Sequence, residues 1–313
     1  MTRPHTINRE RGLRLLRTMR TIRQASERIA ALYPSNVMET PVHLCIGQEA
    51  VAAGVCHHLR DEDKLFLGHR THGPALAKGL GLRPLFAELY GRSTGCSRGF
   101  GGSMHLFDPA HGLPGSSAIV GGSIALAVGA GLSAQLQRAD FVGVAWFGDA
   151  ATNAGVCYES LNFAALRKLP VLFVCEDNGY SNVMPKSAHS AHDIESLAKV
   201  FMPTVAVDGT DVLATFAAAG EALTAIRAGG GPRFLHCKTK RWMKHQGHEP
   251  CDLGVVDRDR DCPIQKLETF LRGSGLLQGA ESTQIAQDIE REIDDAIAFA
   301  AASPFPTPEL LEA

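Results

Sequence analysis

Apolar residues recur at helical spacing toward both ends of the chain. Between residues 8 and 33, leucines, isoleucines and a methionine recur at near-helical spacing with arginines between them, which predicts an amphipathic helix. The same pattern predicts a helix over 47–59 and two closing helices near 263–274 and 281–302. The segment 121–136, GGSIALAVGAGLSAQL, is small and apolar on nearly all sides, so we expect a buried, tightly packed helix there.

Short apolar runs alternate with helical segments in the middle of the chain. Strands are predicted over 141–147, 170–176, 204–207 and 233–238, with helices over 154–167, 192–201 and 210–228 between them. A glycine-rich zone from Gly68 to Gly122 precedes them, with short helices expected around 73–80 and 83–90. Near-continuous apolar strands between helices are typical of a parallel sheet covered on both faces. The prediction is an α/β fold with a doubly wound, mainly parallel sheet.

Composition narrows the class of protein. The 313 residues carry a formal charge of −2 and no strong basic run, which argues against a nucleic-acid partner. No apolar stretch approaches the ~18–20 residues that span a bilayer, and the basic amino-terminal segment lacks the apolar core of a secretory signal. The eight cysteines are scattered, several within apolar runs, as expected of reduced thiols. We expect a cytoplasmic protein with no membrane partner, although charge alone leaves a mitochondrial transit peptide open.

The motif GDAATNAG, residues 148–155, places an acid directly after a predicted buried strand. Asp149 follows the strand 141–147, and Asn178 follows the strand 170–176 in EDNGY. Because parallel strands end at the same edge of a sheet, we expect the two side chains to lie close together. With a backbone carbonyl from Gly179 or Tyr180 they form an oxygen-only set that suits Mg²⁺, and the small residues at 150–155 offer N–H groups to a phosphate. The alternative is that these polar residues simply cap a helix.

Several ordered stretches resemble a known family. LGHRTHGPALAKG, CSRGFGGSMHLFD, AIVGGSIALAVGAG, WFGDAATNAGVCYESLNFAALRKLPVLFVCEDNGY and CKTKRWMKH occur in that order. Together they are similar to the alpha subunits of the thiamine diphosphate-dependent 2-oxo acid dehydrogenases, the pyruvate, branched-chain and acetoin dehydrogenase family. The resemblance covers about residues 8–275. It implies the thiamine diphosphate-binding fold, with an N-terminal helical arm (1–46), an α/β domain (47–260) and C-terminal helices (261–313).

The resemblance also implies roles for particular residues. Asp149, Asn178 and the carbonyl of Tyr180 match the family's Mg²⁺ ligands. His72 and His245 match histidines near the reacting centre and are the expected proton-handling residues. The remaining cofactor contacts implied are the diphosphate-binding pair His69 and Arg70, the backbone at Ala118 and Val120 beneath the cofactor rings, and the amides of Ala150 and Ala151.

Three positions depart from the family's pattern. Ala150 stands where the signature has a glycine, so a left-handed backbone there would weaken cofactor binding. Asp177 replaces an asparagine beside the expected metal ligand, and Ala118 replaces a glycine. His69 stands where pyruvate-type members often have tyrosine and acetoin-type members have histidine. Gln246 follows His245, so the regulatory serine of mammalian pyruvate-type members is absent.

The resemblance further implies partners. In the family a separate beta subunit supplies the glutamate that activates the cofactor, so the resemblance implies an α₂β₂ assembly. Glu49 of IGQEA lies in a family-like helix and is expected to be structural. A lipoyl-bearing acyltransferase accepts the product, and the substrate is a small 2-oxo acid or acetoin. Two alternatives stay open: a thiamine diphosphate-dependent carboligase, and a degenerate subunit without cofactor. The spacing HQGHEPC (245–251) also mimics a zinc site, which we do not favour because a fourth ligand is lacking.

Overall fold

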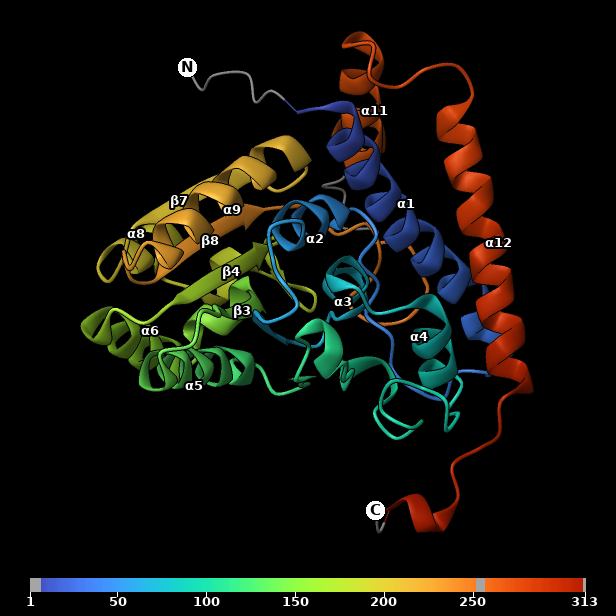
Figure 1. Ribbon diagram of the computed structural model, residues 1–313, viewed down its shortest axis with the longest axis horizontal. Helices are drawn as coiled ribbons and strands as arrows, with labels where there is room; N and C mark the ends of the chain where they lie inside the picture. The colour runs from blue at the N-terminus through green and yellow to red at the C-terminus, as the bar shows by residue number, and fades with distance from the viewer. Residues whose placement is uncertain (1–6, 252–256, 312–313) are drawn as a thin grey trace.

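The computed structural model describes residues 7–251 and 257–311, which form a parallel sheet between two layers of helices (Figure 1). The six strands lie in the order β2-β1-β3-β4-β8-β7, and every pairing is parallel. Their bounds are β1 Lys64–Leu67, β2 Gly115–Ser116, β3 Gly143–Gly148, β4 Val171–Asp177, β7 Thr204–Asp208 and β8 Arg233–Lys238. A small hairpin of β5 (Tyr180–Ser181) and β6 (Met184–Pro185) follows β4. The predicted α/β fold is confirmed.

Successive residues of the central strands enter two separate hydrophobic cores. Val144 and Trp146 of β3 belong to the core that contains α2 (Glu49–Cys56) and α9 (Val212–Arg227). Ala145 and Phe147 instead belong to the core formed with α5 (Gly122–Gln137) and α6 (Gly155–Arg167). This alternation is the period of two of a strand. Because helices cover both faces, every residue of β4 is buried, which explains the unbroken apolar run in the sequence.

The terminal helices pack against one another at one end of the sheet. Figure 1 shows α1 (Arg9–Leu32) running beside α12 (Glu281–Ala302), with α11 (Pro263–Gly273) near its start. The arginines between the apolar positions of α1 reach across: Arg17 and Arg28 pair with acidic residues of α12, and Arg20 pairs with Glu268 of α11. None of the described helices is long and apolar enough to cross a membrane.

The remaining short elements connect these layers. They are α3 His72–Lys78, α4 Leu82–Leu89, α7 Lys186–His189, α8 Ile194–Lys199, α10 Arg258–Asp261 and the 3₁₀ turns η1 Tyr33–Ser35, η2 Gly102–Met104, η3 Pro109–His111, η4 Asp149–Asn153 and η5 Pro308–Leu311. Strand β1 was not predicted, because four residues beside a glycine-rich zone carry too little periodicity to identify a strand.

The prediction that segment 121–136 is buried all round is wrong. Helix α5 buries one side, including Ile124, Ala127 and Val128, against the sheet. Its outer side carries Leu126 and Leu136, which are 54% and 70% exposed. The segment is apolar on all sides although only one side faces the core. Its exposed apolar side is typical of a surface that contacts another molecule.

Candidate active site

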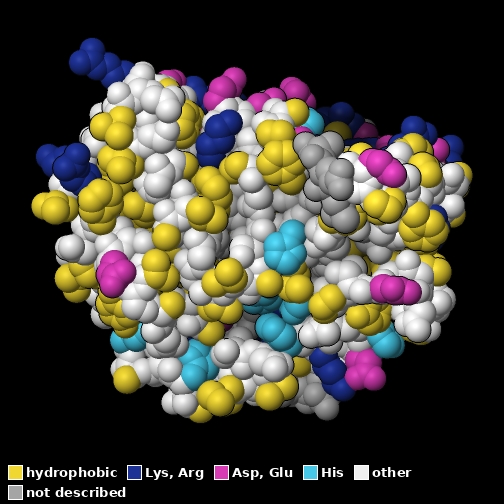
Figure 2. All heavy atoms as spheres, turned by 90° about the horizontal axis from the view of Figure 1, so that it is seen from below, with side chains coloured by type: hydrophobic (Ala, Val, Ile, Leu, Met, Phe, Trp, Pro, Cys, Tyr) yellow, Lys and Arg dark blue, Asp and Glu magenta, His cyan; other side chains and the backbone are white. Residues whose placement is uncertain are grey.

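A cavity of about 270 Å³ lies at the carboxyl ends of β1, β3 and β4, the edge at which open α/β sheets bind ligands. Its walls come from the segments after β1, β3 and β4, the loop before α5, and the segment 241–245 after β8. In Figure 2 histidine side chains gather at a hollow in this face of the molecule. Ten of the eleven predicted site residues line the cavity: His69, Arg70, Ala118, Val120, Asp149, Ala150, Ala151, Asn178, Tyr180 and His245.

The expected metal ligands lie at the ends of neighbouring strands. Gly148 pairs with Glu176 in the β3–β4 register, which sets Asp149 beside the turn that carries Asn178 and Tyr180. Asp149 is 2% exposed and its Oδ2 atom has no hydrogen-bond partner. Burial, and then the charge of Asp177, raises the pKa of Asp149 to about 7. A buried carboxylate with an unsatisfied oxygen, beside an amide and a carbonyl oxygen, is the donor set that Mg²⁺ accepts.

The alanine that departs from the family's signature causes no backbone strain. Ala150 lies in the 3₁₀ turn η4, and it is not among the described residues with a positive φ. An alanine methyl is therefore compatible with the local backbone, and the weakening expected from a left-handed conformation does not apply.

Asp177 lies behind the cavity rather than in its wall. Its Oδ2 atom shares a 2.7 Å hydrogen bond with Nε2 of the buried His236 and accepts another from Lys186 Nζ. Its Oδ1 atom accepts the N–H of Gly179 at 2.9 Å. Burial would raise the pKa of Asp177, but the hydrogen bonds from His236 and Lys186 outweigh it and hold the pKa at about 2. Asp177, which stands where the family has asparagine, is thus fully paired. Its hydrogen bond to Gly179 holds the turn that carries Asn178.

Two buried arginines face the cavity without an acidic partner. Arg70 and Arg241 are 7% and 5% exposed, and no carboxylate of the described residues lies within 4.0 Å of either guanidinium. Arg70 donates to the carbonyl of Leu44 at 2.5 Å, and Arg241 donates to the carbonyl of Asn182 at 2.7 Å. Two fixed cations held by neutral groups make this part of the cavity a site for an anion such as a diphosphate.

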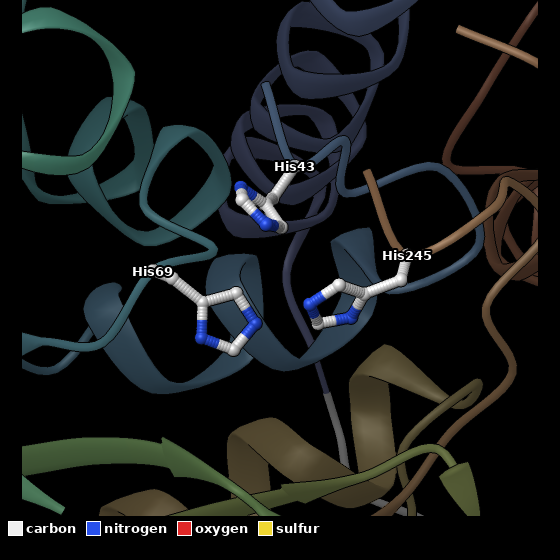
Figure 3. A group of neighbouring side chains, drawn as sticks. All are labelled: His43, His69 and His245. Carbon is white, nitrogen blue, oxygen red and sulfur yellow. The ribbon is translucent and has the colours of Figure 1, made fainter. Parts of the chain in front are cut away.

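Three histidines converge beside these arginines (Figure 3). The ring centroids of His43, His69 and His245 lie 4.8–5.0 Å apart. Burial is the main cause that lowers their pKa values, to about 2, 3 and 4 respectively, and the charge of Arg70 adds to it in each case. All three rings are therefore neutral near pH 7 and can accept a proton or a metal ion.

His72 is the predicted site residue that does not line the cavity. The chain turns into α3 at this residue, which directs the ring toward Ser103, whose Oγ lies 2.8 Å from Nε2. His72 is 1% exposed, and burial together with Arg70 lowers its pKa to about 4. A catalytic role for His72 stays a prediction, and this position would require it to act through a neighbour.

The glycine-rich loop that carries Ser103 is organised by one carboxylate. Glu88 of α4 is 1% exposed, and both of its oxygens accept backbone N–H groups. Its four donors, at 2.7–3.0 Å, are Ser97, Gly99, Gly101 and Gly102. A Cβ at Gly95 would lie 2.3 Å from Oε2 of this carboxylate, so the close approach requires glycine there.

Sequence reasoning missed several polar residues that line the cavity, among them His43, Gln48, Glu176 and Arg241. Glu176 is buried, accepts from Trp146 Nε1 at 3.3 Å, and has its pKa raised to about 7, chiefly by burial. Gln48 Oε1 accepts from the amide of Asn178 at 3.3 Å. The signal for Glu176 was present in EDNGY, since it precedes the metal-ligand turn on a strand whose end forms the cavity.

Two further expectations can be compared with the structure. Glu49 is fully buried and binds Arg23 Nε at 2.5 Å and the N–H of Gly47, so it is structural, as predicted. The zinc-like spacing HQGHEPC does not form a cluster in the described residues. His245 instead joins His43 and His69, whereas the ring of His248 lies against Tyr33.

Comparison with known proteins agrees with this geometry. Residues 17–309 match the family described as dehydrogenase E1 component. The chain is 38% identical to the alpha subunit of acetoin:2,6-dichlorophenolindophenol oxidoreductase from Bacillus subtilis, over 96% of this chain and 92% of that one. It is 36% identical to the pyruvate dehydrogenase E1 alpha subunit of Zymomonas mobilis (97% and 88% covered), and 34% identical to the human mitochondrial somatic form (97% and 79% covered). The chain therefore belongs to the dehydrogenase E1 component family, as an alpha subunit of the 2-oxo acid dehydrogenase type.

Proposed function

We propose that this chain is the alpha subunit of a thiamine diphosphate- and Mg²⁺-dependent enzyme that acts on acetoin or a 2-oxo acid. It would work with a separate beta subunit and transfer the acyl group to a lipoyl group on an acyltransferase. The observation that carries the proposal is the Oδ2 atom of buried Asp149, which accepts no hydrogen bond and has only Nε2 of His189, at 3.8 Å, as an ion-pair contact in the described residues. It lies at the same cavity as two guanidiniums without acidic partners. The bound cofactor would supply the carbon nucleophile and the electron sink that the protein lacks.

The residues present fit this cofactor. Asp149, Asn178 and the carbonyl of Tyr180 would hold Mg²⁺, and Arg70 would hold the diphosphate, with Arg241 as a second cation at the same wall. The remaining contacts expected are His69 for the diphosphate, the amides of Ala150 and Ala151, and the backbone of Ala118 and Val120 beneath the rings.

The chain's own part in the reaction is to position groups, exclude water and move protons. His69 and His245 are neutral near pH 7 because burial and the arginines disfavour their protonation. A pKa near 3 or 4 makes each ring a weak base before a ligand binds. The negative charge of a bound diphosphate would raise these pKa values, toward the range in which a histidine can take up a proton and return it. Arg241 Nη1 lies 3.4 Å from Nδ1 of His245 and orients that ring. His72 would act through Ser103 and not directly.

The surface beside the cavity supports a partner subunit. The loop at Ile119 and Val120, of which Val120 lines the cavity, is strongly exposed and apolar, and exposed apolar residues continue along the outer side of α5. Figure 2 shows hydrophobic side chains gathered on this face, around the hollow that contains the histidines. An exposed apolar surface of this kind marks an interface. We propose that the beta subunit covers it, closes the cavity and contributes the activating glutamate, in an α₂β₂ assembly.

Acetoin is the substrate to test first. His69 occupies the position at which acetoin-type members have histidine, and two relatives are named for acetoin. Relatives named for pyruvate are similar to about the same degree, at 34–38% identity, so pyruvate is the second substrate to test. Neither the carboligase nor the cofactor-less subunit gains a specific observation, and the unsatisfied Asp149 argues against the latter. The cytoplasmic location stays a prediction.

Native mass spectrometry of the chain purified with its partner tests the proposal. We expect a heterotetramer that retains two thiamine diphosphates with Mg²⁺ and reduces dichlorophenolindophenol with acetoin or pyruvate. Asp149→Ala should abolish retention of the cofactor, whereas Asp140→Ala, at an exposed residue paired only with Arg60, should retain it. A homo-oligomer that takes up no cofactor at saturating concentration would overturn the proposal, as would full activity of Asp149→Ala.

A further inference from the structure

We propose that His43, His69 and His245 form a second metal site, which binds Zn²⁺ or a similar transition-metal ion and blocks the cavity when occupied. This site is separate from the oxygen ligands at Asp149, but it shares His69 and His245 with the proposed cofactor and proton-handling groups. It would make the enzyme sensitive to inhibition by free zinc.

The three side chains come from distant segments but present one ring nitrogen each to a common point (Figure 3). His43 precedes α2, His69 follows β1, and His245 follows β8. The facing nitrogens all lie within 4.8 Å of one another. Tetrahedral zinc, with Zn–N bonds of about 2.0–2.1 Å, requires nitrogens about 3.4 Å apart, so small side-chain rotations would complete the geometry. Three histidines with an open fourth position are an established zinc coordination pattern.

The state of the histidines supports a ligand. His43 is 5% exposed, and its Nδ1 atom has no hydrogen-bond partner within the described part of the chain. A buried imidazole nitrogen without a partner is unfavourable unless something binds it. All three rings are neutral near pH 7, which is the form that ligates metals. Imidazole ligands select transition metals over Mg²⁺, which takes oxygen.

Arg70 and Arg241 limit the affinity. Arg241 lies 3.4 Å from Nδ1 of His245, and Arg70 lies 3.5 Å from its carbonyl oxygen. These fixed charges repel a dication, so we expect zinc to bind far more weakly here than at a structural zinc site. They also favour an anion such as hydroxide or phosphate in the fourth position, where it neutralises the ion.

Occupation of this site would obstruct the chemistry. The three histidines line the same cavity as Asp149, Ala118 and Tyr180. A metal ion with its fourth ligand would hold His69 and His245 in place and fill the space between them. Zinc should therefore inhibit the assembled enzyme competitively with the cofactor or substrate, at concentrations at which Mg²⁺ does not.

Cobalt is the probe that tests the site without any measurement of activity. The assembly, stripped of metal and without thiamine diphosphate, is titrated with Co²⁺ at pH 7.5, and the visible absorption is recorded before and after addition of Zn²⁺. We expect one cobalt per alpha chain, with the intense bands of tetrahedral coordination, displaced by stoichiometric zinc. His43→Gln and His245→Gln should each weaken cobalt binding at least about 10-fold.

Two controls locate the ion. His57→Gln changes a partly buried histidine outside the cluster and should leave the bands unchanged. Asp149→Asn should also leave the cobalt bands unchanged. Loss of the proposed Mg²⁺ site can therefore be distinguished from loss of the histidine site. Weak octahedral bands, or equal binding in wild type and both cluster variants when each is folded, would overturn the inference.

Discussion

The buried carboxylate of Asp149 should destabilise the protein when no metal is bound. Its pKa is raised from 3.8 to about 7 in the folded chain. A shift of about three units corresponds to roughly 4 kcal/mol of unfavourable burial at alkaline pH. In Asp149→Asn this term is absent, but the amide must satisfy its own polar atoms at a cost of about 1–3 kcal/mol. We therefore expect the variant, stripped of cofactor, to be more stable than wild type by about 1–3 kcal/mol at pH 8.

The sign of the pH dependence follows from the raised pKa. Above pH 7 Asp149 is ionised in both folded and unfolded chains, so the full penalty is present. As the pH falls from 7 toward 4, the folded chain takes up a proton first and the penalty disappears. The advantage of Asp149→Asn should shrink over this window. Glu176, whose pKa is also raised to about 7, and the histidines with lowered pKa values are present in both proteins and cancel in the difference.

Addition of Mg²⁺ and thiamine diphosphate should reverse the order of stability. Wild type gains about 4.1 kcal/mol at a ligand concentration about 1,000 times the dissociation constant, whereas the variant gains almost nothing. The measurement is urea unfolding of the assembly with its partner, with and without both ligands, at pH 5, 6.5 and 8. Asp140→Asn should follow wild type throughout. A stripped Asp149→Asn that is less stable than wild type at pH 8, or that retains the ligand-induced gain, would refute this account of the cavity.

Three further substitutions test other parts of the site. Arg70→Lys keeps the charge but loses the fork, and calorimetry should show about 10- to 100-fold weaker thiamine diphosphate binding. Glu88→Ala leaves four loop N–H groups without an acceptor, and should lower the free energy of unfolding by about 2–4 kcal/mol in urea titrations. Lys186→Met leaves the Oδ2 atom of Asp177 with His236 alone, and hydrogen exchange over residues 179–189 should become faster while the core strands are unchanged.

The proximity of Asp149 and Asn178, the expected metal ligands, could be predicted because it depends on local topology. A strand, a helix and a second parallel strand fix which edge both strand ends share, and Asp149 and Asn178 are each within a residue or two of those ends. The buried pattern of β3 and β4 identified the strands, and the pairing in register confirms them. When a motif spans a single strand–helix–strand unit, the relative positions of its residues can be predicted from the sequence alone.

His43 and Arg241 could not be found in this way. Each reaches the cavity through tertiary packing: His43 by the loop before α2, and Arg241 by the segment after β8. No periodicity or spacing in the sequence relates these segments to β3. The motif HRTHG shows the opposite case, since it suggested two site histidines, whereas the turn into α3 buries His72 against Ser103 and leaves His69 in the cavity. Because α3 begins within this motif, two histidines that are close in the sequence have side chains in different surroundings.

The cavity's charges argue for a ligand that carries both signs. At one wall an ionisable carboxylate has an oxygen without a hydrogen-bond partner, and at another Arg70 and Arg241 lack acidic partners. These groups do not neutralise one another, because no ion pair within 4.0 Å joins Asp149 to either guanidinium in the described structure. A lone anion would satisfy the arginines and repel Asp149, and a lone cation would do the reverse. A magnesium-bound diphosphate presents a cation to the carboxylate and anionic oxygens to the arginines, so it alone among these satisfies both walls at once.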